Sequence, residues 1–194
     1  MPRDTGVRGE LRFIVRVLAV MLGLLWSIEL IDALVLGGGL DAYGVQPRSV
    51  AGLVGVATMP LLHGNFAHLL SNTIGILVFG TLVLMYGRRE FFGVTLAAWL
   101  FGGLGAWLFG SAASVHIGAS GLVFGYFGYV LMRGVYERRF LSIVVSLVIG
   151  LLFGGTLAGA IPGLADAGIS WQGHLFGLLG GVLVARRHRK RAAE

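Results

Sequence analysis

Residues 118–132 read GASGLVFGYFGYVLM, an apolar run that carries Ser120 near its start and stops one residue before Arg133. A second apolar run begins at His174 and stops before Arg186. At about 1.5 Å of helical rise per residue, Ser120 and His174 each lie roughly 18–20 Å from these basic residues. Because the hydrocarbon core of a bilayer is about 30 Å thick, both side chains would lie about 10 Å below the opposite surface. A hydroxyl and an imidazole at matching depth in lipid favour nucleophilic catalysis inside the membrane.

The composition of the chain indicates a membrane protein. Of its 194 residues, 56% are hydrophobic and only 12% are charged, whereas soluble domains carry about 25% charged residues. The 33 glycines allow close contact between membrane helices. The sequence contains no cysteine, which excludes disulfides, thiolate metal sites and cysteine nucleophiles.

Six apolar stretches predict an all-α, polytopic membrane protein with six transmembrane helices. They span residues 13–31, 67–86, 91–110, 119–132, 140–160 and 173–185. The fourth and sixth are short for a span, as expected of helices that begin below the membrane surface in a polar cavity. We expect one membrane domain at 13–185, a short cytoplasmic segment at 1–12 and a basic cytoplasmic tail at 186–194. The connections at 39–66 and 157–172 are long enough to be functional, and we expect the second, which contains Asp166, to act as a mobile lid.

The basic residues predict the orientation of the chain, whose net charge is +6. With the N-terminus inside, fourteen of the fifteen fall on the cytoplasmic side and only Arg48 falls outside, in agreement with the positive-inside rule. The fourteen are Arg3, Arg8, Arg12, Arg16, Arg88, Arg89, Arg133, Arg138, Arg139, Arg186, Arg187, Arg189, Lys190 and Arg191. We therefore expect a multi-pass protein of the plasma membrane with both termini cytoplasmic and a site open to the outer face. The basic tail is predicted to touch anionic lipid rather than nucleic acid.

Further polar residues and paired glycines accompany the serine and the second histidine. His63, His68 and Asn72 lie at the start of the second stretch, the last two on one helical face. Ser120 is followed by Gly121 and Gly125, and His174 by Gly177 and Gly181. A Gly-x-x-x-Gly pair lets two membrane helices approach closely. One such pair lies on each helix that must bring serine and histidine together, so we expect these four glycines to pack the two helices.

Each polar residue also has an interpretation without catalysis. The hydroxyl of Ser120 could bond the carbonyl four residues back in its own helix. His174 could be a hydrogen bonder in packing, and His68 with Asn72 could tie their helix to its neighbours. His116, in a short outer loop, is expected to need no role. The catalytic hypothesis is favoured because serine, two histidines and asparagine all fall in the outer leaflet.

Three motifs, in order along the chain, resemble those of the rhomboid intramembrane serine proteases. They are HGNFAHLLSN at 63–72, GASG at 118–121, and HLFG at 174–177 followed by Gly181. The resemblance covers most of residues 58–185. It implies that Ser120 is the nucleophile and His174 the general base, in a dyad without a carboxylate, metal or cofactor.

The resemblance also implies the supporting residues and the substrates. His68 and Asn72, with the backbone N–H of Ser120, would line the oxyanion hole, and His63 would lie near the cavity mouth. Gly118 belongs to the nucleophile motif. Phe124 occupies the place of a tyrosine that stacks on the catalytic histidine in many members. The substrates would be transmembrane proteins cut near the outer end of their membrane segment.

Two other classes of function stay open. One is a catalytically inactive, rhomboid-like membrane chaperone or adaptor, although such relatives usually lose the serine or the histidine. The other is a haem or proton-conducting membrane protein that uses His68 and His174. The physiological substrate and the oligomeric state are not indicated by the sequence.

Overall fold

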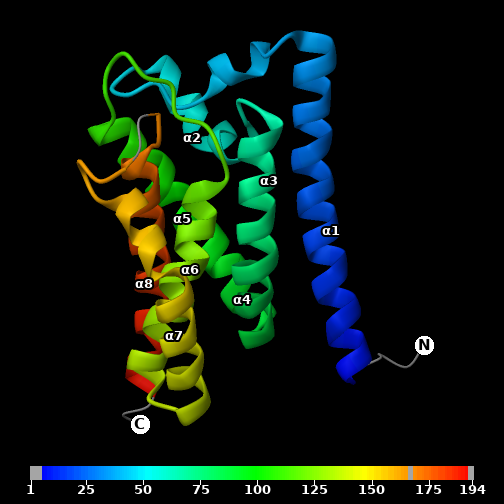
Figure 1. Cartoon of the computed structure of the whole chain (residues 1–194), viewed down its shortest axis with the longest axis vertical. Helices are drawn as coiled ribbons and strands as arrows, with labels where there is room; N and C mark the ends of the chain where they lie inside the picture. The colour runs from blue at the N-terminus through cyan, green and yellow to red at the C-terminus, as the bar shows by residue number, and fades with distance from the viewer. Residues whose placement is uncertain (1–5, 166–167, 192–194) are drawn as a thin grey trace.

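The computed structural model describes residues 6–165 and 168–191 as a bundle of helices whose long members run along one common direction (Figure 1). Asp166 therefore lies outside the described residues, as do residues 1–5 and 192–194 at the two predicted cytoplasmic ends. The α-helices are α1 (Val7–Ile31), α2 (Val54–Thr58), α3 (Phe66–Gly75), α4 (Thr81–Tyr86), α5 (Arg88–Phe109), α6 (Ser120–Glu137), α7 (Phe140–Phe153) and α8 (Trp171–Arg191). A π-helical turn at Asp32–Leu36 extends α1, and another at Ile76–Gly80 joins α3 to α4. Short 3-10 helices cover Gly39–Tyr43, Ala51–Leu53, Met59–Leu61 and Gly154–Ala160.

All six apolar stretches fold as helices, but the first and last helices are longer than predicted. α1 begins at Val7 rather than at residue 13, and α8 continues to Arg191 rather than ending at 185. The extra turn of α1 carries charged residues, and its Glu10 pairs with Arg88 at 3.1 Å. Apolar patterning does not report such turns, because a helix can continue into water on charged residues that favour helix formation.

Four helical segments are long and apolar enough to cross a membrane, within the part of the chain that the structure describes. They are Val7–Leu36, Phe66–Tyr86, Arg88–Phe109 and Phe140–Ala160. α6 and α8 are not among them, although both stand inside the bundle, where α6 packs against α5, α7 and α8. A helix that faces other helices more than lipid can contain glycine and polar side chains, since its neighbours satisfy them.

α6 and α8 approach each other backbone to backbone at their glycines. A Cβ added to Gly177 would overlap the carbonyl of Gly121, and one added to Gly181 would overlap the carbonyl of Gly125. A Cβ on Gly125 would in turn lie 3.1 Å from the carbonyl oxygen of Gly177. The structure thus places all four predicted packing glycines at one helix contact.

The connection between α1 and α3, which the sequence suggested was a loop, contains helical turns that are fastened to α5. The indole N–H of Trp99 donates to the carbonyl of Val56, and that of Trp107 to Ser49, both at 2.8 Å. Arg48 has a left-handed backbone (φ 57°), and its guanidinium donates to the carbonyl of Gly110 at 2.7 Å. The one basic residue expected outside therefore satisfies a carbonyl at the C-terminal end of α5.

Arg133, which the sequence predicts at the membrane boundary, is buried within the protein with 7% of its surface exposed. Its guanidinium donates twice to the carboxylate of Glu137, at 2.9 and 3.2 Å, and also to the hydroxyl of Tyr129. Ser142 of α7 donates to the same carboxylate at 2.6 Å. The charge is tolerated inside the protein because a carboxylate one helical turn away pairs with it.

The glycine contact generates a prediction about stability. Gly181→Ala should force α6 and α8 apart and lower the free energy of unfolding by about 1–3 kcal/mol, the usual cost of overpacking. Gly23→Ala is the matched control, because a Cβ at this position of α1 meets nothing within 4 Å. Thermal unfolding in one detergent should show a midpoint several degrees lower for Gly181→Ala only. Equal midpoints for the two variants would contradict the contact.

Candidate active site

Ser120 is the first residue of α6 and is delivered by a tight turn at Gly118. Gly118 has φ +113°, a backbone conformation that favours glycine. Its N–H donates to the carbonyl of Met59 at 2.8 Å, which ties the turn to the connection between α1 and α3. Because the first N–H groups of a helix have no partner within the helix, the start of α6 offers donors and a positive dipole end beside the hydroxyl of Ser120.

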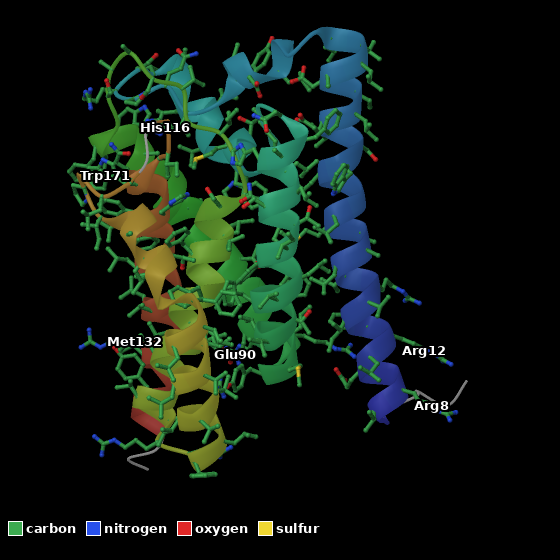
Figure 2. The ribbon with its side chains drawn as sticks, in the orientation of Figure 1. Arg8, Arg12, Glu90, His116, Met132 and Trp171 are labelled. Carbon is green, nitrogen blue, oxygen red and sulfur yellow. The ribbon has the colours of Figure 1, made fainter. Side chains whose placement is uncertain are left out.

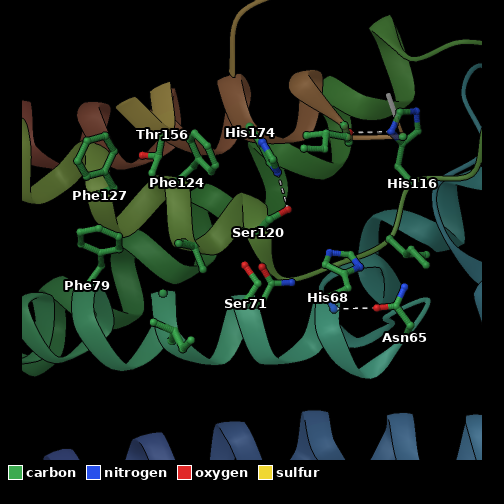
Figure 3. Close-up of a pocket in the computed structure, with 18 of the residues that line it drawn as sticks. Asn65, His68, Ser71, Phe79, His116, Ser120, Phe124, Phe127, Thr156 and His174 are labelled. Carbon is green, nitrogen blue, oxygen red and sulfur yellow. Dashed lines mark hydrogen bonds between the residues drawn. The ribbon is translucent and has the colours of Figure 1, made fainter. Parts of the chain in front are cut away.

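His174, in the first turn of α8, is hydrogen-bonded to Ser120. Its Nε2 lies 2.7 Å from the Oγ of Ser120, and Figure 3 shows this bond as a dashed line between the two helices. The Nδ1 of His174 lies 2.9 Å from the carbonyl oxygen of Gly159. Since a carbonyl oxygen can only accept, Nδ1 carries the proton and Nε2 presents its lone pair to the serine hydroxyl. The imidazole therefore has the tautomer that a general base for Ser120 requires.

The ring of Phe124 stacks on the imidazole of His174. The two ring centroids are 4.1 Å apart and the ring planes differ by 13°. A Cβ added to Gly159 would lie 3.4 Å from both His174 Nδ1 and the tip of Phe124, so a bulkier residue would crowd the ring. Gly159 is a site residue that motif reasoning missed, because only its carbonyl and its lack of a side chain matter.

His68 and Asn72 on α3 face Ser120 across a cavity of about 670 Å³. Figure 3 shows the side chains of Ser120, His174 and His68 directed into this space. Asn72 is 4% exposed, and its amide nitrogen has no hydrogen-bond partner among the described residues. A Cβ on Gly118 would collide with the ring of His68 at 2.6 Å. The nucleophile turn thus lies directly against the two predicted oxyanion donors.

His63 lies behind His68 rather than at the cavity mouth. It is 2% exposed, and its ring meets the ring of His68 edge-on with centroids 5.1 Å apart. Its Nε2 accepts from the N–H of Ala119 at 3.4 Å. Burial lowers the pKa of His63 to about 4, so the ring is neutral at pH 7 and can accept this bond. His63 supports the turn before Ser120 and the ring of His68.

Two further polar residues line the cavity beside the site. The side chain of Asn65 accepts from the backbone N–H of His68 at 2.9 Å and caps α3 (Figure 3). His116, for which the sequence indicated no role, is 7% exposed and lines the cavity. Within the described ranges, no group of three or more His, Cys, Asp or Glu side chains is arranged to hold a metal ion.

Comparisons with known proteins agree with the motifs. Residues 51–191 match the rhomboid domain family. An uncharacterized protein of Mycobacterium tuberculosis, Rv1337, is 44% identical over 168 residues, covering 84% of this chain and 70% of the relative. The putative rhomboid protease YdcA of Bacillus subtilis is 34% identical over 127 residues, covering 64% of this chain and 62% of the relative. The rhomboid protease GluP of Bacillus subtilis is 33% identical over 132 residues, covering 64% of this chain and 24% of the relative.

The family match contains α3 to α8 and with them every residue of the site described above. It confirms the resemblance carried by the three motifs. The helical segments that can span a bilayer agree with it. The chain is a multi-pass, all-α membrane protein that belongs to the rhomboid family.

Proposed function

We propose that this protein is an intramembrane serine protease that hydrolyses peptide bonds in or near transmembrane segments through a Ser120–His174 dyad. The observation that carries the proposal is the 2.7 Å contact from His174 Nε2 to Ser120 Oγ, with Nδ1 engaged by the carbonyl of Gly159. A serine hydroxyl is a weak nucleophile until a base takes its proton, and neutral imidazole is suited to that task.

The reaction follows from this geometry. Nε2 of His174 takes the hydroxyl proton while Ser120 Oγ attacks the scissile carbonyl carbon, which gives a tetrahedral oxyanion. The imidazolium then donates its proton to the leaving amine, and the acyl-enzyme is hydrolysed by water that His174 activates in the same way. His68, Asn72 and the N–H of Ser120 would stabilise the oxyanion, where donors in a site of low dielectric constant have their largest effect. The amide nitrogen of Asn72, which has no hydrogen-bond partner among the described residues, suits this role.

The alternatives are less well supported. An inactive chaperone or adaptor has no need of a serine and a histidine in bonding contact. A haem ligand must offer a free imidazole nitrogen, but both ring nitrogens of His174 are already hydrogen-bonded.

The substrate must unwind locally, because a peptide bond within a helix is shielded from attack. We therefore infer transmembrane proteins as substrates, cut where their helix is interrupted.

The proposal includes six membrane crossings with both termini in the cytoplasm of the cell. α6 and α8 would cross as short central helices that start below the outer surface, at Ser120 and close to His174. Water would reach the dyad from the outer face through the 670 Å³ cavity. The positive-inside distribution of basic residues supports this orientation in the plasma membrane.

Replacement of either dyad residue should abolish activity and leave the fold intact. Ser120→Ala and His174→Ala should not cleave a model transmembrane substrate, because the first lacks the nucleophile and the second the base. A fluorophosphonate should label the wild-type protein at Ser120, and mass spectrometry should find no adduct on Ser71, which lines the same cavity. Cleavage by the Ser120→Ala variant would refute the proposed mechanism.

Removal of an oxyanion donor should slow the reaction without removing it. Asn72→Ala should lower kcat about 10²-fold with little change in KM, because the oxyanion exists only in the transition state. Thr73→Val is the matched control. Thr73 is the next residue along α3, and its hydroxyl accepts a hydrogen bond from the indole N–H of Trp26 in α1 at 3.1 Å. Substrate titrations of both variants should separate them. An unchanged kcat for Asn72→Ala would exclude Asn72 from the oxyanion hole.

The orientation can be tested with single cysteines, since the chain has none of its own. We expect an impermeant maleimide to label Ala113→Cys and Leu164→Cys from outside the cell, and Arg89→Cys and Phe140→Cys only after the membrane is opened. All four positions are exposed, so a failure to react cannot be ascribed to burial in the fold. Labelling of Leu164→Cys from the cytoplasm would rule out six crossings.

A further inference from the structure

His116 lies in a chain of hydrogen bonds whose direction can be assigned. The hydroxyl of Ser114 donates to the carbonyl of Ser111 at 2.7 Å. Its single hydrogen is therefore used, and its oxygen must accept a hydrogen bond from His116 Nε2, which lies 2.9 Å away. Nε2 therefore carries the ring proton, and Nδ1 accepts from the hydroxyl of Ser170 at 2.7 Å. The oxygen of Ser170 then accepts the N–H of Gly173 at 3.2 Å. Each polar hydrogen in this series of hydrogen bonds is donated once.

This series of hydrogen bonds ends at the turn of α8 that carries His174. Ser170 precedes Trp171, the first residue of α8, and its hydroxyl accepts an N–H of the first turn as an N-cap. The carbonyl of Ser170 also accepts the N–H of His174 at 3.1 Å. The loop before Ser120 and the start of α8 are thus joined through one imidazole.

His116 is itself held in place from other directions. Its backbone pairs with Val45 through two hydrogen bonds of 2.9 Å, one in each direction. A Cβ on Gly110 would overlap Nε2 of the His116 ring, so the residue that follows α5 packs directly against this ring. Burial lowers the pKa of His116, which keeps the ring neutral and Nδ1 available as an acceptor.

We propose that His116 is a positioning residue for the dyad: through Ser170 it holds the start of α8 so that His174 Nε2 stays in bonding distance of Ser120. The inference rests on the proposed protease function and adds to it a residue outside the three rhomboid motifs. Among the described residues, the side chain of His116 bonds Ser114 and Ser170 rather than Ser120 or His174, so it acts on the dyad through Ser170. A shift of about 1 Å between nucleophile and base can cost about 10²-fold in rate.

The geometry of the imidazole provides a matched pair of variants. The side-chain oxygen of asparagine is two bonds from Cβ, as Nδ1 is, so His116→Asn keeps an acceptor for Ser170. The terminal atoms of glutamine are three bonds from Cβ, as Nε2 is, so His116→Gln keeps the contact to Ser114 and loses the one to Ser170. Both variants remove the ring and are expected to lose similar stability.

The test measures kcat, KM and the rate of fluorophosphonate labelling for the wild type, the three His116 variants and Ser170→Ala. His116→Ala and His116→Gln should lower kcat and the labelling rate about tenfold to a hundredfold, with KM nearly unchanged. His116→Asn should recover most of the loss. Adding Ser170→Ala to His116→Ala should cost little more than either alone, because both break the same tether.

The outcomes separate the two proposals. If the wild type is labelled and His116→Asn is as slow as His116→Gln, with thermal midpoints lowered equally, His116 serves only the stability of the outer loop and the positioning role is wrong. If His116→Ala is labelled at the wild-type rate, the tether does not position the dyad, although the dyad stands. A wild type that the probe never labels would overturn the proposed protease and the positioning role with it.

Discussion

The backbone contact between α6 and α8 is the constraint on which the rest of the structure depends. Ser120 and His174 stand at the starts of these two helices, so the distance between the side chains is set by the distance between the helix axes. The glycines at 121, 125, 177 and 181 remove the atoms that would hold the axes apart. The 2.7 Å bond between the two side chains is favoured by this proximity, because glycines let the two backbones approach more closely than larger side chains would.

The glycine contact sets the spacing of the helices, and neighbouring residues set the orientation of the two side chains. The carbonyl of Gly159 determines which nitrogen of His174 carries its proton, and Phe124 limits the tilt of the ring. Gly118 brings the turn before Ser120 against His68. These contacts come from the connection between α7 and α8, from α6 itself and from the turn before Ser120, whose Gly118 N–H is bonded to the carbonyl of Met59. The contacts around Ser120 and His174 are therefore set by the fold itself, and the proposed transition-state stabilisation depends on such preorganisation.

The two ends of the bundle deal with polarity differently. At the end that carries Ser120 and His174, the amide nitrogen of Asn72 lies at a cavity and has no partner among the described residues. At the opposite end, the charges of Arg133 and Glu137 satisfy each other and further hydroxyl groups. Unpaired donors suit a site that must bind a transient oxyanion, whereas a paired network holds helices together. The polar side chains at the two ends of the bundle thus have two separate explanations.

The sequence by itself determined the class of protein and the family, and it predicted the residues of the proposed dyad. Composition and apolar runs indicated a helical membrane protein, and three motifs of a few residues each indicated rhomboid membership, because these features are local along the chain. They also placed Ser120, His174, His68 and Asn72 at similar depth. Only the tertiary structure decided that Gly159 orients His174, that His63 lies behind His68, that Arg133 is buried, and that His116 is joined to Ser170. Each of these depends on atoms from segments that the chain brings together only when folded, or on a backbone carbonyl that every residue type possesses. Side-chain patterns therefore carry no signal for them.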